Sequence, residues 1–202
     1  MDEKGILLII SGPSGAGKGT VVENLIKNGE YSLSISATTR KPRPYEQDGI
    51  HYFFKDKDDF DKMIEGGELL EYACFCGNYY GTPKEYVKEQ IDKGVNIILE
   101  IEVQGALQVK ELYPEAVLIF LAPPSIGELE KRLVGRGTED IRVVQKRIER
   151  AVEEMEYVCR YDYIVINDFV ESAAKKIIDI TSAEKARVFR NLEFYKTFKG
   201  EI

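Results

Sequence analysis

The chain has 202 residues, with 28 Lys or Arg against 35 Asp or Glu, so its net charge is -7. This length suits one domain with small inserted lobes, and a composition that is 44% hydrophobic and 31% charged excludes a disordered chain. The acidic balance also argues against a nucleic-acid-binding protein, because phosphate neutralisation supplies most of that affinity.

The rare residues narrow the chemistry further. His51 is the only histidine, which leaves no pair for a metal site and no Ser/His/Asp relay. The three cysteines fit no zinc-binding spacing, and we expect them to be buried free thiols in a reducing cytoplasm. The apolar run at 6–10 is too short for a signal peptide, and we expect no membrane-spanning segment.

Near-continuous apolar runs predict buried strands at 6–11, 31–36, 96–101, 117–121 and 163–166. Helical patterns occupy 19–27, 103–112, 126–133, 143–158 and 170–190. This alternation predicts an α/β fold of three layers, in which helices cover both faces of a parallel sheet.

Two capping-box patterns mark predicted helix starts. One runs from Ser125 to Glu128, and the other runs from Thr82 to Glu85 with Pro83 at the first helical position.

Residues 37–95 break the alternation and predict an inserted lobe of short strands and two helices. The core would then comprise 1–36 and 96–202. Glycines beside clustered arginines predict a short mobile lid at 136–150.

The strongest motif follows the first strand and opens the first helix. It consists of Gly12, Pro13, Ser14, Gly15, Ala16, Gly17, Lys18, Gly19 and Thr20. Its spacing predicts a phosphate-binding loop, in which backbone N–H groups surround phosphate oxygens and Lys18 reaches the outer phosphates. Gly19 stands where Ser or Thr usually offers a hydroxyl to Mg²⁺, so we expect the metal to rest chiefly on nucleotide oxygens and water.

A second motif carries two arginines three residues apart. Pro42 and Pro44 stiffen the segment around Arg40 and Arg43, which predicts a fork suited to a doubly charged phosphate.

Several motifs together resemble the guanylate kinase family, in the right order from about residue 6 to about residue 190. They are the phosphate loop, the segment TTRKPRPYE at 38–46, GNYYG at 77–81, LEIEVQG at 99–105, APPS at 122–125 and RLVGRGT at 132–138. The resemblance implies a P-loop kinase that transfers the γ-phosphoryl of MgATP to GMP and dGMP, in the cytoplasm, with no obligate protein partner.

The resemblance also implies roles for single residues. Its GMP-binding positions match Ser36, Arg40, Arg43, Glu46, Tyr52, Glu71, Tyr80, Thr82, Glu100 and Glu102, and its donor-binding positions match the loop with Arg132, Arg136, Arg147 and Asn167. Glu71 would hold the guanine edge, because guanine offers two adjacent N–H donors to a carboxylate. Transfer would rest on the positive charges of Lys18, Arg40, Arg136 and Arg147.

Structural explanations stay open for several of these residues. Ser36 ends a strand, Thr82 fits a helix N-cap, and Asn167 with Asp168 is ordinary turn chemistry. Arg150 fits a solvated helix face better than a phosphate site.

Two acidic residues at the end of a predicted strand have competing explanations. Glu100 is a candidate to orient Mg²⁺ through water, and Glu102 replaces the family's more frequent Asp. Pairing with Arg40 or Lys18 across the cleft explains either carboxylate about as well.

Other classes remain as rivals. A peptide-binding scaffold domain of the same type typically loses part of the phosphate loop, which is intact here. Related kinases of ribosyl bisphosphate or of other nucleotides share the loop, but Glu71 with the GNYYG segment favours guanine.

Overall fold

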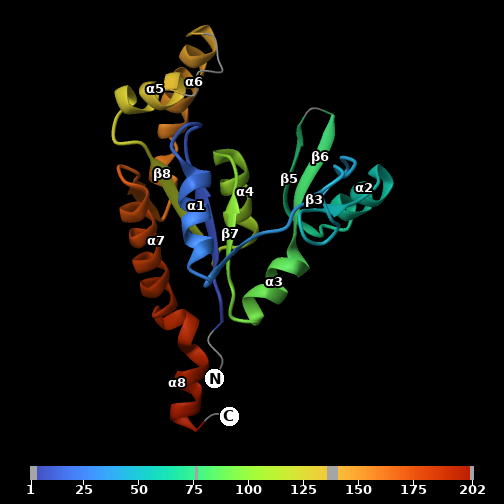
Figure 1. The fold of residues 1–202 in the computed structure, drawn as a ribbon. Coiled ribbons are helices and arrows are strands. Elements are labelled where there is room, and N and C mark those ends of the chain that lie inside the picture. The colour runs from blue at the N-terminus through green and yellow to red at the C-terminus, as the bar shows by residue number, and fades with distance from the viewer. Residues whose placement is uncertain (1–3, 76, 136–140, 201–202) are drawn as a thin grey trace.

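The computed structural model describes residues 4–75, 77–135 and 141–200. At its centre is a five-stranded parallel sheet in the order β2-β7-β1-β8-β9 (Figure 1). The strands are β1 (Leu7–Ser11), β2 (Tyr31–Leu33), β7 (Asn96–Glu100), β8 (Val117–Ala122) and β9 (Tyr163–Ile166). The predicted parallel sheet is thereby confirmed.

Helices cover both faces of this sheet, because its strands are apolar on both sides. In β1, Leu8 and Ile10 belong to one core cluster while Leu7 and Ile9 belong to the other. The first face carries α1 (Lys18–Lys27) and α7 (Val170–Lys185), and the second carries α3 (Lys84–Asp92) and α4 (Val103–Leu112). The predicted three-layer α/β architecture is confirmed.

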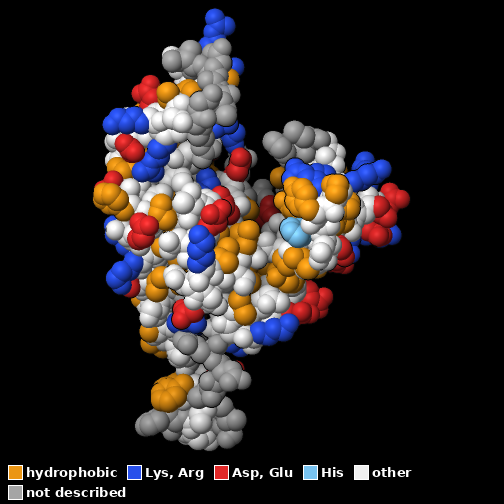
Figure 2. All heavy atoms as spheres, viewed as in Figure 1, with side chains coloured by type: hydrophobic (Ala, Val, Ile, Leu, Met, Phe, Trp, Pro, Cys, Tyr) orange, Lys and Arg blue, Asp and Glu red, His pale blue; other side chains and the backbone are white. Residues whose placement is uncertain are grey.

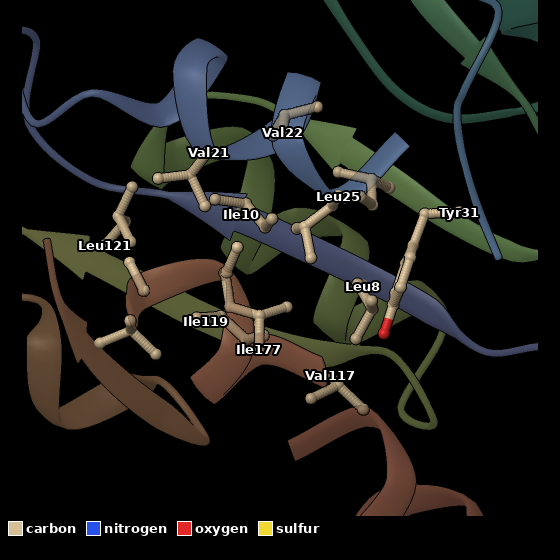
Figure 3. Packing of buried hydrophobic residues seen from close by; sticks show 14 of the residues in the cluster. Leu8, Ile10, Val21, Val22, Leu25, Tyr31, Val117, Ile119, Leu121 and Ile177 are labelled. Carbon is tan, nitrogen blue, oxygen red and sulfur yellow. The ribbon is translucent and has the colours of Figure 1, made fainter. Parts of the chain in front are cut away.

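The core beneath α1 and α7 fixes the position of the strand that precedes the phosphate loop. Figure 3 shows Val21 and Leu25 of α1 directed toward Ile10 of β1, with Ile177 of α7 on the same side of the sheet. All four side chains are fully buried. Burial of each such side chain contributes about 1.5–3 kcal/mol.

A second, four-stranded sheet forms from the segment that interrupts the alternation. Its order is β4-β3-β6-β5, comprising β3 (Ala37–Thr38), β4 (Phe53–Phe54), β5 (Leu69–Phe75) and β6 (Asn78–Pro83). Helix α2 (Lys57–Glu65) packs on it through the buried ring of Phe60, which stacks on Tyr79 at 5.5 Å. Leu70 of β5 and Val87 of α3 belong instead to the core of the central sheet, and so join the two parts.

Helices α5 (Ile126–Gly135) and α6 (Ile141–Met155) stand together at one end of the molecule (Figure 1). They pack through a small cluster that includes Leu129, Leu133 and Val144. The predicted cap of α5 is confirmed, since the backbone N–H of Glu128 donates to Ser125 Oγ at 3.1 Å.

Three predicted elements end at least three residues earlier than expected. Strand β2 stops at Leu33, and the chain then leaves the central sheet and enters β3. Helix α6 stops at Met155, before a short 3-10 turn at Val158–Arg160. Helix α7 stops at Lys185 and is followed by a 3-10 turn at Val188–Asn191 and by α8 (Leu192–Lys199).

A buried carboxylate explains why α7 ends where it does. Glu184 is 2% exposed and accepts hydrogen bonds from Tyr163 Oη at 2.7 Å and from Arg187 Nη1 at 3.2 Å. Arg190 Nη2 lies 3.5 Å from the same carboxylate. A continuous helix cannot bring both arginines back to one point, so the chain turns. Helix α8 then extends past the end of α7 (Figure 1), with Phe194 and Tyr195 more than half exposed.

The expectation of buried thiols is wrong for the two cysteines within the described ranges. Cys74 and Cys159 are free and exposed. Cys74 lies in the outer half of β5, beyond the buried Leu69 and Leu70, and Cys159 lies in the short turn after α6. Cys76 lies outside the described residues. Within residues 4–75, 77–135 and 141–200, none of the helices combines the length and the hydrophobicity that a membrane-spanning segment needs.

Candidate functional site

The loop between β1 and α1 is shaped by glycines that other residues cannot replace. Gly12, Gly15 and Gly17 have φ values of 141°, 93° and 89°. A Cβ atom on Gly12 would lie 2.1 Å from the carbonyl oxygen of Leu121 in the neighbouring strand β8. The loop therefore lies directly against the sheet, at the N-terminus of α1, where the helix dipole favours an anion.

Lys18 crosses this loop from the first turn of α1. Its Nζ donates to the carbonyl oxygens of Gly12 at 2.5 Å and Pro13 at 3.2 Å. Burial lowers the pKa of Lys18, while the charges of Glu100, Glu154 and Glu102 oppose that shift. Its ammonium group is thus held at the loop by two backbone carbonyls.

Arg132 and Asn167 hold the backbone of the loop through the carbonyl group of Ala16. Asn167 is buried, and its Nδ2 donates to the carbonyl of Ala16 at 2.7 Å. Arg132 donates from Nη1 to the same carbonyl at 3.4 Å and from Nη2 to the carbonyl of Asn167 at 2.9 Å. Both residues lie beside the loop, and in this structure their contacts hold its backbone.

A cleft of about 420 Å³ opens in front of the loop, and we call it the donor cleft. It is lined by Gly12, Ser14, Lys18, Glu100, Ile101, Glu102, Arg147, Arg150 and Glu154. Figure 2 shows a hollow between the part of the molecule built on the central sheet and the part that contains the second sheet, with acidic and basic side chains along its edge. Sequence reasoning named most of this lining but missed Glu154. It lies seven residues after Arg147, at a spacing that places both on one helix face.

A second hollow of about 200 Å³, the acceptor hollow, lies where the two sheets meet. Its lining comprises Leu33, Ser34, Ser36, His51, Tyr52, Thr82, Ile98, Leu99, Glu100 and Ile101. The structure thus brings together four predicted GMP-binding residues, Ser36, Tyr52, Thr82 and Glu100. It adds His51, which no motif had marked. Glu100 and Ile101 line both cavities.

Glu71 and Thr82 meet across the β5–β6 ladder. The hydroxyl of Thr82 donates to Glu71 Oε1 at 2.7 Å. Burial raises the pKa of Glu71, and the hydrogen bond from Thr82 partly offsets that effect. The predicted capping role of Thr82 is wrong, because Pro83 is the N-cap of α3 and the Thr82 hydroxyl is used by Glu71.

Arg40 forms a cluster with a carboxylate and aromatic rings. Its Nη2 donates to Glu46 Oε1 at 2.8 Å, and its guanidinium lies 5.3 Å from the ring centroid of Tyr52. The Tyr52 and Tyr80 rings lie 6.1 Å apart in an edge-to-face contact. Because Tyr52 lines the acceptor hollow, it connects this cluster to that cavity.

Glu46 holds the two predicted phosphate-binding arginines in register. Its Oε1 binds the Arg40 side chain, and its Oε2 accepts from the backbone N–H of Arg43 at 2.7 Å. These bonds lower the pKa of Glu46 to about 2. The Arg43 side chain is 60% exposed and donates to Tyr45 Oη at 3.1 Å.

The pairing of Glu102 differs from what the sequence suggested. Its Oε2 accepts from Arg150 Nη2 at 2.7 Å, so its partner is neither Arg40 nor Lys18. Arg150 also pairs with Glu154 on its own helix, and it lines the donor cleft rather than a purely solvated face. Arg147 lines the same cleft. Arg136 and the start of the predicted lid lie outside the described residues.

A glycine-rich phosphate loop lies between a parallel strand and a helix, and the cleft in front of it shares Glu100 and Ile101 with a second polar hollow. This combination is that of a P-loop kinase. Comparison with known proteins specifies which one. Residues 4–184 match the profile of the guanylate kinase family, and the chain belongs to that family. Its members are ATP:GMP phosphotransferases.

Individual relatives agree over nearly the whole chain. The guanylate kinase of Desulfitobacterium hafniense is 52% identical over 92% of this chain and 94% of its own length. That of Halalkalibacterium halodurans is 55% identical over 96% and 95%, respectively. The crystal structure of guanylate kinase from Anaplasma phagocytophilum superposes with a TM-score of 0.71 at 33% identity, covering 100% of this chain and 98% of that one.

Proposed function

We propose that this chain binds ATP in the donor cleft and GMP in the acceptor hollow, and transfers the γ-phosphoryl group between them. The observation that carries this proposal is the shared wall. Glu100 and Ile101, at the end of β7, line both cavities. Two substrates seated on either side of this wall would have their reacting phosphates close together, which is the main requirement of phosphoryl transfer.

On the donor side, the loop amides and Lys18 would hold the ATP phosphates, and Arg147 would reach the transferred group. Arg132 and Asn167 would keep the loop in its binding conformation through the Ala16 carbonyl. Arg136, in the lid that we propose at 136–150, would also bind the ATP phosphates. The positive charges would stabilise the oxygens of the transferring group, where charge is spread in the transition state.

Mg²⁺ belongs to this proposal as the ion carried by ATP. Among the described residues, no group of three acidic, histidine or cysteine side chains could hold a metal. The carboxylate oxygens of Glu100 lie 3.9 Å from the place a Cβ of residue 19 would take, beside the phosphate loop. Glu100 would therefore meet the ion through water, as Mg²⁺ often permits. The bound ion would neutralise phosphate charge.

On the acceptor side, Glu71 would read the guanine base. Its half-buried carboxylate can accept two parallel hydrogen bonds from N1–H and N2–H₂ of guanine, and Thr82 fixes its orientation. Adenine would leave the carboxylate facing an acceptor, which is costly for a buried polar group. Arg40, Arg43 and the two tyrosines would hold the GMP phosphate.

The chemistry needs no general base in this proposal. A GMP phosphate oxygen is already anionic at neutral pH, so the protein has only to position it and neutralise charge. The lobe at 37–95 and the lid at 136–150 would close over the substrates and exclude water that would otherwise hydrolyse ATP. The proposal extends to dGMP, requires no partner besides the nucleotides, and places the reaction in the cytoplasm, where those nucleotides are found.

Replacing Glu71 by Gln tests the base assignment. We expect the preference for GMP over AMP, measured as the ratio of the two kcat/KM values, to fall roughly 10- to 100-fold, because a charged hydrogen-bond acceptor is lost. KM for ATP should stay unchanged. The matched control is Glu68→Gln, an exposed carboxylate just before β5. A Glu71→Gln enzyme that discriminates as well as wild type would overturn the base assignment.

A further inference from the structure

Arg150 links helix α6 to the segment that follows β7, the strand whose end lies between the two cavities. Its Nη2 donates to Glu102 Oε2 at 2.7 Å, and its Nε donates to Glu154 Oε1 at 3.2 Å. Glu154 lies one turn further along α6, whereas Glu102 is the N-cap of α4, directly after β7. One guanidinium therefore connects two elements that are 48 residues apart in sequence.

The charges around Arg150 explain why the donor cleft can accept an anion. The described lining holds three carboxylates, Glu100, Glu102 and Glu154, and three cations, Lys18, Arg147 and Arg150. Arg150 covers two of the carboxylates at once. Glu154 Oε2 is buried without a hydrogen-bond partner among the described residues, and burial raises the pKa of Glu154. Without Arg150, a polyphosphate entering the cleft would meet uncompensated negative charge.

Glu102 lies next to the wall that the two cavities share. It is an N-cap residue whose side chain makes no capping bond, since the carboxylate is turned to Arg150. Its neighbour Ile101 lines both cavities, and Glu102 itself lines the donor cleft. The pair is exposed, with 59% of the Arg150 side chain and 76% of the Glu102 side chain accessible, so a competing anion can separate it easily.

We propose that Arg150 couples donor binding to acceptor binding by exchanging Glu102 for the donor polyphosphate. This inference rests on the proposed function. Donor phosphates entering the cleft compete with Glu102 for the guanidinium. Glu102 is then released beside Ile101, which lines the acceptor hollow, so its carboxylate becomes available to the acceptor and the donor tightens GMP binding. By thermodynamic linkage, GMP tightens donor binding by the same factor.

The test is calorimetric titration of GMP into the full chain, alone and with saturating Mg²⁺ and the β,γ-imido analogue of ATP. The measured quantity is the ratio of the two GMP dissociation constants. We expect Arg150→Gln to lower this ratio about two- to fivefold, the range for an exposed ion pair. Arg150→Lys, which keeps the charge, should return most of it. In a Glu102→Gln background, the Arg150→Gln change should have no further effect on the ratio.

Lys146→Gln is the matched control, because Lys146 is an exposed cation one turn earlier on α6 and outside both cavities. It should leave the ratio at the wild-type value. An Arg150→Gln protein with the wild-type ratio would overturn the coupling role, as would an equal loss in Lys146→Gln or a further loss in the Glu102→Gln background. Wild-type protein that binds neither nucleotide would overturn the proposed function together with this inference.

Discussion

At the scale of single residues, Glu46 organises the two arginines that we propose to bind the GMP phosphate. Its two oxygens bind the Arg40 side chain and the Arg43 backbone, and they hold the two arginines in a fixed relation. The same bonds lower the pKa of Glu46 to about 2, from its usual value of 4.5. A group whose pKa is lowered by folding stabilises the folded state above its unfolded pKa, and this stabilisation is lost as the pH falls toward the folded pKa.

Glu46→Gln should therefore make the free energy of unfolding less dependent on pH in the acidic range. We expect wild type to lose stability as the pH falls from about 4.5 to about 2, and the variant to lose less over the same window. Urea unfolding at a series of pH values measures this difference, with Glu65→Gln on α2 as an exposed control. Parallel curves for wild type and Glu46→Gln would contradict the assignment.

Thr82 influences the ionisation of Glu71, because its hydroxyl donates a hydrogen bond to that carboxylate. In the proposed function, guanine recognition requires ionised Glu71, so we expect GMP binding to be lost as the pH falls through the pKa of that carboxyl, which burial has raised. Thr82→Val removes the hydrogen bond that lowers this pKa, and should shift the loss of GMP binding to higher pH. KM for GMP measured across pH 5–8 shows the shift, while KM for ATP is the internal control. Identical pH profiles in the two enzymes would count against the Thr82–Glu71 bond.

These residues also show where reading the sequence succeeds and where it cannot. The resemblance assigned Glu71 and Thr82 to one site, and the structure joins the two side chains by a hydrogen bond. The capping pattern around Thr82 suggested a local bond, which the structure replaces with this cross-strand one. The Glu102–Arg150 pair had no local signal at all. It depends on the tertiary packing that brings α6 near the N-terminus of α4, which neither segment encodes by itself.

At the scale of elements, the phosphate loop is fixed by the sheet beside it. Gly12 has a φ of 141°, and the oxygen of Leu121 leaves no room for a side chain. A motif of glycines predicts such a turn, and the adjacent strand β8 explains why the first glycine is needed.

Gly12→Ala should displace the loop and lower kcat/KM for ATP by about 10²-fold or more, the usual cost of misplacing reacting groups by about an ångström. GMP binding, measured by calorimetry, should persist if the fold is intact, because the acceptor hollow is built from other segments. Gly127→Ala on α5 is the control, since a Cβ there would make only an ordinary contact of 3.9 Å with Ser125 Oγ. Wild-type kcat/KM for ATP in Gly12→Ala would disprove this account of the loop.

Element boundaries were less predictable than the elements themselves. Apolar runs located all five central strands, because burial on both faces leaves an unambiguous pattern. The end of α7 depends on Glu184, whose partners Tyr163 and Arg190 come from β9 and from beyond the helix. Such long-range contacts override local helical propensity, so the predicted helix at 170–190 was too long.

At the scale of the whole molecule, the candidate site lies between two sheets. The strands of the second sheet are inserted in the sequence between β2 and β7 of the central sheet. The central sheet supplies the loop and the shared wall at Glu100, and the second sheet lies beside it (Figure 1). The segment that forms the second sheet adds Tyr52 and Thr82 to the acceptor hollow, and Thr82 donates a hydrogen bond to Glu71. Alternating strands and helices predicted the first sheet, and the interruption after residue 36 predicted a separate lobe. The joining of the two parts through Leu70 and α3 follows only from the packed structure.

The measurement that tests this account most directly is ADP formation by the purified chain from MgATP with GMP, AMP, UMP, CMP and dTMP in turn. It examines the phosphate loop, base selection and transfer together. The account predicts rapid turnover with GMP, and with dGMP in a further assay, and background rates with the other four acceptors. Comparable turnover with AMP, or none with GMP in a folded protein that still binds ATP, would contradict it.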